Sequence, residues 1–222
     1  MNKSNLVPRS MRKFAKQAHD ASDRFVIHAE LRNQGLRNVD RISTWTTQEE
    51  LLTLYRLASR CAENAVALEI GSYLGAATCY IGAGLARNAG RIICVDTWQN
   101  ETMPDGLRDT YSEFKANTLA LQARITTIRK RSDELAPGEL PDRLDFVFLD
   151  GDHSYAATRH DFLLVAERIA PEGIIAFHDA TAFQGVSRVI GEALTTGNWM
   201  LRGMVNNLAW ISPRTWPETH RA

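Results

Sequence analysis

The segment from Ala67 to Gly75 reads ALEIGSYLG, and these residue types suit a pocket for a small molecule. The apolar start predicts a buried strand, and the glycines predict a tight turn into a helix. A second apolar segment ends in Asp96, 25 residues after Gly71. A helix N-terminus beside such a turn binds polar ligand groups, and a carboxylate at this distance can accept hydrogen bonds from ribose hydroxyls. Together they predict a site for a cofactor that contains adenosine.

The spacing of the glycines indicates which kind of cofactor this is. A dinucleotide site uses G-x-G-x-x-G so that backbone amides can approach a pyrophosphate. This chain has Glu69-x-Gly71-x-x-x-Gly75, with Ser72 and Tyr73 filling the loop. The leading carboxylate would repel a phosphate, so the pattern favours a ligand with a cationic amine and no phosphate. The alternative interpretation is a chance turn with two structural glycines.

Two later apolar segments are also followed by residues that could do chemistry. Segment 144–149 runs into Asp150, Asp152 and His153, and segment 174–177 runs into His178 and Asp179. Because neighbouring parallel strands end at the same edge of a sheet, we expect these side chains to converge beside the cofactor. Clustered carboxylates repel one another unless a cation lies between them, and oxygen ligands suit Mg²⁺. The alternative is that the aspartates cap helices and the histidines are ordinary turn residues.

Short apolar runs alternate with amphipathic stretches along most of the chain. This alternation predicts an α/β fold, with a doubly wound, mostly parallel sheet covered by helices on both faces. The expected strands are 65–70, 91–96, 125–130, 144–149 and 173–178, and the expected helices are 10–33, 48–60, 75–88, 107–121, 155–169 and 185–195. Segments 199–204 and 207–212, joined around Asn206-Asn207, predict an antiparallel hairpin at the sheet edge.

The glycine segment resembles motif I of the class I S-adenosylmethionine (SAM) methyltransferases. The run Leu149-Asp-Gly-Asp-His-Ser-Tyr155, with the later Phe177-His178-Asp179, resembles the metal-dependent O-methyltransferases, including catechol and macrolide-sugar enzymes. The resemblance covers about residues 45–212. It implies a Rossmann-like, seven-stranded sheet with an antiparallel C-terminal strand. It also implies a SAM-dependent methyltransferase domain over 45–222, preceded by a helical, basic extension over 1–44.

The resemblance implies roles for individual residues. The expected cofactor-binding residues are Glu69, Gly71, Ser72, Tyr73, Gly75, Asp96, Thr97, Ser132 and Asp150. Asp150 and Asp179 match ligands of Mg²⁺ or another divalent cation, and His178 stands at a third ligand position that is usually acidic. His153 or Asp152 would take the proton of an acceptor hydroxyl. We favour His153, because a free imidazole titrates near about pH 6.5.

Several other residues are left with open interpretations. Trp98 either stacks on the adenine, lines the acceptor site or packs in the core. Thr78 or Ser72 is expected to hold the methionine carboxylate of SAM. His160 and Asp161 fall within a helical pattern and are expected at the surface.

The expected function is a SAM-dependent, Mg²⁺-assisted O-methyltransferase acting on a hydroxyl of a sugar or related polar natural product. A catechol or other phenolic acceptor is the alternative within this class. A nucleotide-dependent oxidoreductase is disfavoured because the third glycine is missing. The remaining alternative is a methyltransferase fold that binds ligands without catalysis.

Composition limits the partners and the compartment. Lys and Arg total 26 and Asp and Glu total 26, so we expect no nucleic acid partner. No segment approaches the roughly 20 apolar residues of a membrane span. Three scattered cysteines and the lack of an apolar leader predict a cytoplasmic protein. The basic N-terminal extension is a candidate surface for pairing two copies of the chain.

Overall fold

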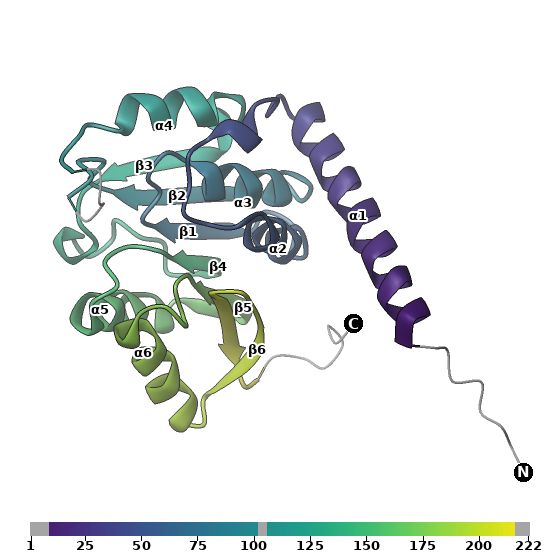
Figure 1. Cartoon of the computed structure of the whole chain (residues 1–222). Coiled ribbons are helices and arrows are strands. Elements are labelled where there is room, and N and C mark those ends of the chain that lie inside the picture. Colours follow the sequence, from purple (N-terminus) through teal and green to yellow (C-terminus); the bar gives the residue numbers. More distant parts are fainter. Residues whose placement is uncertain (1–8, 102–105, 216–222) are drawn as a thin grey trace, which may run out of the picture.

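A seven-stranded sheet organises the residues that the computed structural model describes, which are 9–101 and 106–215 (Figure 1). The strand order is β3-β2-β1-β4-β5-β7-β6. The strands are β1 Val66–Ile70, β2 Arg91–Asp96, β3 Ile125–Arg129, β4 Leu144–Leu149, β5 Ile169–Phe177, β6 Trp199–Val205 and β7 Leu208–Pro213. Strands β1 to β5 are parallel, and β7 runs antiparallel to both β5 and β6. The predicted fold class, with its antiparallel C-terminal hairpin, is therefore confirmed.

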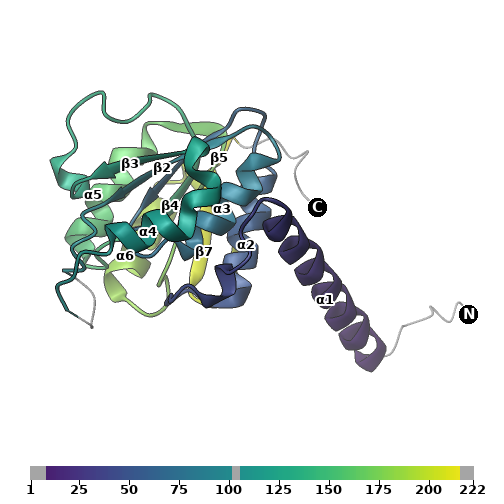
Figure 2. The same cartoon turned by 90° about the horizontal axis from the view of Figure 1, so that it is seen from above.

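Helices cover both faces of this sheet. They are α1 Arg9–Asn33, α2 Gln48–Ser59, α3 Ala76–Ala86, α4 Tyr111–Thr118, α5 Tyr155–Ala166 and α6 Gln184–Thr195, with short 3-10 turns at Val39–Arg41, Leu119–Arg124 and Ser132–Glu134. Figure 2 shows α2, α3 and α4 on one side and α5 and α6 on the other. Phe146 and Phe148 pack into the first core, and Val147 and Leu149 into the second. Alternating strand side chains point to opposite faces, so the mostly apolar β4 supplies both cores.

The loop after β2 differs from the prediction of a helix over 107–121. The helix α4 begins only at Tyr111 and ends at Thr118. The carbonyl of Trp98 accepts the Thr110 N–H at 2.9 Å. The Trp98 ring is fully buried, with ring centroids 4.9 Å from Tyr111 and 4.8 Å from Phe114. Of the three interpretations of Trp98, packing in the core is correct. This packing, with the bond from Thr110 to Trp98, keeps residues 107–110 in a loop before α4.

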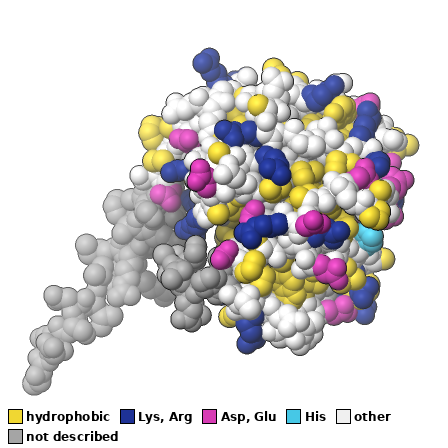
Figure 3. Space-filling model, turned by 180° about the vertical axis from the view of Figure 1, so that it is seen from behind, with side chains coloured by type: hydrophobic (Ala, Val, Ile, Leu, Met, Phe, Trp, Pro, Cys, Tyr) yellow, Lys and Arg dark blue, Asp and Glu magenta, His cyan; other side chains and the backbone are white. Residues whose placement is uncertain are grey.

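Helix α1 extends away from the body of the protein (Figures 1 and 2). Its last turns are anchored, because Ile27 and Leu31 are buried in the same core as α2, whereas Phe25 is 70% exposed. On the face seen in Figure 3, basic and acidic side chains are interspersed rather than gathered by sign. Among the helices described, none has the length and apolar character needed to cross a bilayer.

Candidate active site

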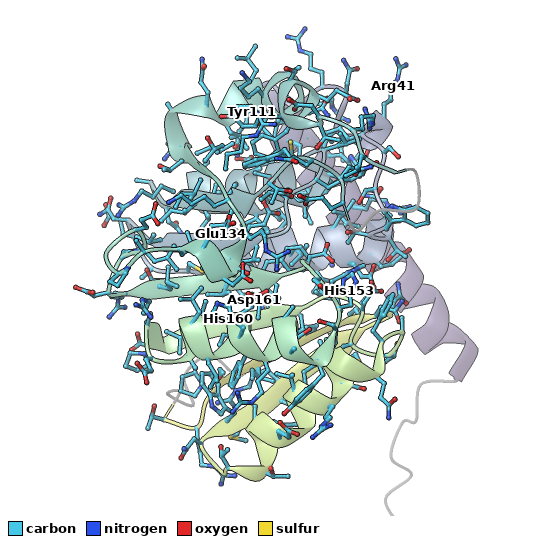
Figure 4. All side chains as sticks on the ribbon, turned by 90° about the vertical axis from the view of Figure 1, so that its left-hand side faces the viewer. Arg41, Tyr111, Glu134, His153, His160 and Asp161 are labelled. Atoms are coloured by element: carbon cyan, nitrogen blue, oxygen red, sulfur yellow. The ribbon has the colours of Figure 1, made fainter. Side chains whose placement is uncertain are left out.

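The carboxyl ends of the parallel strands open into a cavity of about 840 Å³. This volume is within the range of about 300–1,000 Å³ that is usual for small-molecule sites. Figure 4 looks onto this edge of the sheet, where His153, His160 and Asp161 lie. The cavity brings together most of the predicted site residues: Gly71, Ser72, Tyr73, Asp96, Thr97, Ser132, Asp150, Asp152, His153, His178 and Asp179. The other two, Glu69 and Gly75, shape the loop that forms one wall.

The glycine turn after β1 allows two loops to touch. Gly71 has a φ of 86°, and a Cβ at this position would lie 2.1 Å from the carbonyl oxygen of Asp150. Gly75 also has a φ of 86° and is the N-cap of α3. Only glycine adopts this conformation without strain while leaving room for the opposing backbone. The turn therefore places the N-terminus of α3 beside the loop that carries Asp150.

Asp96 ties the glycine loop to the end of β2. Its Oδ2 accepts the backbone N–H groups of Ser72 at 2.7 Å and Tyr73 at 2.9 Å. Its Oδ1 accepts the backbone N–H of Trp98 at 2.6 Å. A carboxylate has about four acceptor positions, so Asp96 retains capacity for a ligand hydroxyl. The predicted ribose acceptor thus also orders the loop beneath the ligand.

Glu69 is fully buried under this loop. Its Oε2 accepts the hydroxyls of Ser72, at 2.7 Å, and Thr78. Both hydroxyl protons are thus directed at Glu69, and the role of Ser72 or Thr78 toward the methionine carboxylate of SAM stays a prediction. Its Oε1 has no hydrogen-bond partner among the described residues. Burial raises the pKa of Glu69 to about 7, although these hydrogen bonds oppose the shift.

Asp150, His153 and Asp179 form a cluster whose candidate ligand atoms all lie within 4.8 Å of one another. Nε2 of His153 is 3.5 Å from Oδ1 of Asp150 and 3.4 Å from Oδ2 of Asp179. Asp179 has a φ of 54°, a conformation that is uncommon outside glycine. The His153 ring stacks on Phe183, with centroids 4.6 Å apart. Two carboxylates and an imidazole at this spacing are a donor set suited to a divalent cation.

His178 lies behind this cluster and is only 3% exposed. Its Nδ1 is 3.1 Å from Oδ1 of Asp150 and 3.6 Å from Oδ2 of Asp179. Its Nε2 is 3.4 Å from Oε2 of Glu50. Burial opposes a charge on His178, but hydrogen bonds to Asp150, Asp179 and Glu50 outweigh it and raise the pKa to about 12. The predicted ligand role of His178 stays a prediction, now with its surroundings defined.

The histidines supply the positive charge of this region. Burial would raise the pKa of Asp150, but hydrogen bonds from His153 and His178 hold it below its ordinary value. Burial would lower the pKa of His153, while the hydrogen bond and charge of Asp150, followed by the charge of Asp179, raise it. The two imidazoles thus balance the charge of Asp150 and Asp179 where no cation is bound.

Asp152, the alternative proton acceptor, has a different setting. It is exposed, and its Oδ1 accepts the backbone N–H of Ser154 at 2.8 Å. Ser154 is the N-cap of α5 and accepts the N–H of Ala157. Asp152 therefore shapes the turn that precedes α5, but the N-cap of the helix is Ser154. Of the two candidates, His153 is the one that lies against Asp150 and Asp179.

The other end of the cavity contains Ser132 and Asp161, and the prediction that Asp161 lies at the surface is wrong. Asp161, expected at the surface, is 3% exposed. It hydrogen-bonds Ser132, and burial raises its pKa to about 6. The reason is packing: α5 turns this side chain toward the loop after β3, while His160 on the same helix is exposed as expected. Nearby, the hydroxyl of Thr97 donates to Glu101 at 2.7 Å.

Two further residues near the site, the buried Glu50 and the cavity-lining Trp45, were not predicted as site residues. The Thr47-x-x-Glu50 pattern predicts a capping box, which the structure confirms, but no local signal predicts its contact with His178, 128 positions away. Trp45 and Phe183 both line the cavity, and they are 67% and 46% exposed. An isolated tryptophan before a helix carries no signal that would place it at a ligand site.

Solved structures share this fold. CalS11, a TDP-rhamnose 3′-O-methyltransferase of calicheamicin biosynthesis, is 18% identical over 81% of this chain and 92% of its own, with a TM-score of 0.59. TomG from Streptomyces achromogenes, an O-methyltransferase of tomaymycin synthesis solved with SAM, is 14% identical over 86% and 89%, with a TM-score of 0.57. An O-methyltransferase from Bacillus cereus, solved with S-adenosylhomocysteine (SAH), is 15% identical over 83% and 88%, with a TM-score of 0.60.

A protein-family comparison covers the parallel strands of the sheet, β1 to β5. Residues 68–180, about half of the chain, match the family described as a methyltransferase domain. The matched range begins in β1, beside Glu69, and ends just after Asp179, so it contains the glycine turn, Asp96 and the whole carboxylate cluster. This agrees with the resemblance that the motifs indicate. The chain belongs to the methyltransferase domain family.

Proposed function

We propose that this protein transfers a methyl group from SAM to a hydroxyl of a sugar or related polar natural product, with the assistance of a divalent cation such as Mg²⁺. One observation carries the proposal. A single cavity contains both the glycine loop after β1 with Asp96, which suits the cofactor, and the Asp150–His153–Asp179 cluster, which suits a cation and its bound hydroxyl. Placing the two sites in one cavity allows a methyl donor and an acceptor to meet.

The residues present fit the methyl donor. The loop leaves no side chain at Gly71, where a Cβ would collide with the Asp150 carbonyl. Asp96 retains acceptor capacity for one ribose hydroxyl. The unpartnered Oε1 of Glu69 is a buried acceptor under the loop. Such an oxygen favours a positively charged neighbour and disfavours a phosphate, which agrees with the cationic, phosphate-free character of SAM.

Methyl transfer is an in-line displacement, so the protein must orient the acceptor and remove its proton. The acceptor oxygen forms a bond to the methyl carbon as the carbon–sulfur bond breaks, and sulfur keeps the electron pair to give SAH. Asp150 and Asp179 would hold the cation, which when bound lowers the pKa of a coordinated hydroxyl. His153, whose ring lies against both carboxylates, would take the hydroxyl proton.

A sugar acceptor is supported by CalS11, whose named substrate is TDP-rhamnose. The exposed rings of Trp45 and Phe183 favour a second candidate, a catechol or other phenolic acceptor, because flat apolar faces stack well on aromatic rings. Both classes can present two neighbouring oxygens to a cation. We rank the sugar first because the cavity is otherwise lined by many polar side chains.

Calorimetric titration with SAM and SAH, with and without Mg²⁺, tests the proposal first. We expect micromolar or tighter binding, about −8 kcal/mol or better. Release of SAH is then followed with nucleotide sugars and with catechols as acceptors. Mg²⁺-dependent turnover of a sugar supports the first candidate, and turnover of catechols alone supports the second. No binding of either cofactor form, with or without Mg²⁺, would reject the methyltransferase reaction.

A further inference from the structure

Glu50 caps α2 and also reaches the cation site proposed above. Its Oε2 accepts the backbone N–H of Thr47 at 2.7 Å and the Thr47 hydroxyl at 2.8 Å. Its Oε1 accepts the backbone N–H of Asn207, in the turn between β6 and β7, at 2.7 Å. A capping glutamate needs only the bond to the N-cap backbone, yet the Glu50 side chain is 1% exposed. This burial indicates a role beyond capping.

His178 is the group that Glu50 meets in the interior. Nε2 of His178 lies 3.4 Å from Oε2 of Glu50. An ionised carboxylate has no proton to give, so this contact uses an N–H at Nε2. The buried ring also lies edge-on to Phe148, with centroids 6.2 Å apart and planes at 78°. Glu50 and Phe148 together determine which ring nitrogen faces the cavity.

The other nitrogen of His178 faces the proposed cation ligands. Nδ1 is 3.1 Å from Asp150 and 3.6 Å from Asp179, whereas Nε2 is directed at Glu50. Histidines at metal sites commonly donate their second N–H to a carboxylate that orients the ring. Glu50, His178 and the two aspartates are arranged in this order, with Glu50 furthest from the cavity.

We propose that Glu50 is a positioning residue for the cation site: it accepts the Nε2–H of His178 and thereby directs Nδ1 toward Asp150 and Asp179. The proposal rests on the proposed function, because it needs a cation at these carboxylates. Through the bonds of Glu50 to Thr47 and Asn207, it links the site to α2 and to the β6–β7 turn. These elements lie outside residues 68–180, the part of the chain that matches the family.

Mn²⁺ binding to the full chain, without cofactor or acceptor, tests this role, because free Mn²⁺ is measured directly by its paramagnetic resonance signal. We expect Glu50→Gln, which keeps the size of the side chain and one acceptor oxygen, to weaken Mn²⁺ binding by about 10–100-fold. Its affinity for SAH should be unchanged. Glu49→Gln is the matched control, since Glu49 is exposed on the same turn of α2, and it should change neither affinity.

Thr47→Ala separates capping from positioning. It removes the capping hydroxyl but leaves the contact between Glu50 and His178, so we expect a lower Tm with unchanged Mn²⁺ affinity. If Glu50→Gln folds, binds SAH normally and binds Mn²⁺ as tightly as the wild type, Glu50 is only a cap and the proposal is overturned. If Glu50→Gln does not fold, Glu50→Asp is the second test, since it withdraws the carboxylate from His178. Weaker Mn²⁺ binding with normal SAH binding supports the positioning role, and unchanged Mn²⁺ binding overturns it.

Wild-type protein that binds no Mn²⁺ is a different result. It would reject the cation site itself, and the positioning role of Glu50 would fall with it. Retained SAH binding in that case would leave the methyl-donor part of the proposed function intact.

Discussion

Gly185 of α6 lies directly against the backbone of His153: a Cβ at residue 185 would be 2.4 Å from the His153 carbonyl oxygen and 2.5 Å from the Tyr155 amide nitrogen. Helix α6 can approach the loop after β4 this closely only because residue 185 has no side chain. The neighbouring Phe183 stacks on the His153 ring from the same segment. The position of His153 in the loop after β4 therefore depends on a glycine in α6.

Gly185→Ala is expected to displace either α6 or the 152–155 loop. Overpacking of this kind costs about 1–3 kcal/mol, and turnover should fall further than stability alone explains. Gly191→Ala is the control, because it lies in the same helix with no atom within 4 Å of its Cβ; it should stabilise by about 0.5–1 kcal/mol. Urea unfolding and turnover measure both effects. Equal stability and activity in the two variants would contradict the contact.

Stability should depend on pH through Glu69. Its pKa is about 7 in the folded protein against an ordinary value of 4.5. The folded state therefore binds this proton more tightly than the unfolded state. The resulting contribution of Glu69 to the free energy of unfolding is fully present below pH 4.5 and is lost as the pH rises through about 7. The loss is roughly 3 kcal/mol, since one pKa unit corresponds to about 1.4 kcal/mol.

Glu69→Gln removes the titrating group and provides the comparison. Urea unfolding of both proteins at several pH values between about 5 and 8, without cofactor, should show the wild type losing stability relative to the variant as pH increases. The raised pKa of Asp161 acts in the same direction in both proteins and cancels in the difference. A difference that does not change with pH would show that Glu69 titrates normally.

His153→Ala and Asp152→Ala distinguish the two candidate bases. Loss of a general base lowers the rate about 10²–10⁴-fold, so we expect this effect for His153→Ala and a small one for Asp152→Ala. Mn²⁺ affinity is the second measurement. A large loss of Mn²⁺ binding in His153→Ala would make His153 a cation ligand instead of the base, and a larger rate loss in Asp152→Ala would reverse the assignment.

Asp96→Ala should weaken cofactor binding, because it removes the ribose acceptor and the carboxylate that orders the glycine loop. Hydrogen bonds to a charged group contribute about 1.5–3 kcal/mol, which corresponds to a loss of roughly tenfold or more in SAH affinity. Asp109→Ala is the control, because Asp109 is exposed and pairs with Arg129 at the surface. Calorimetry with SAH measures both variants. The same affinity in Asp96→Ala and the wild type would exclude the ribose assignment.

The sequence by itself determined the fold class and the cofactor end of the cavity. Strand and helix periods are local properties, and parallel strands end at one edge, so the turn around Gly71 and the carboxylates of Asp96, Asp150 and Asp179 could be placed together without coordinates. The Thr47-x-x-Glu50 cap was predictable for the same reason, because its partners are three residues apart.

Only the tertiary structure decided which side chains meet across distant elements. Asp161 is buried and His160 is exposed because of what α5 packs against, and this is not written in the helix itself. Glu50 contacts His178 across 128 positions, and Trp98 is enclosed by rings from α4. Such contacts depend on the relative placement of whole elements, which short-range sequence patterns do not encode.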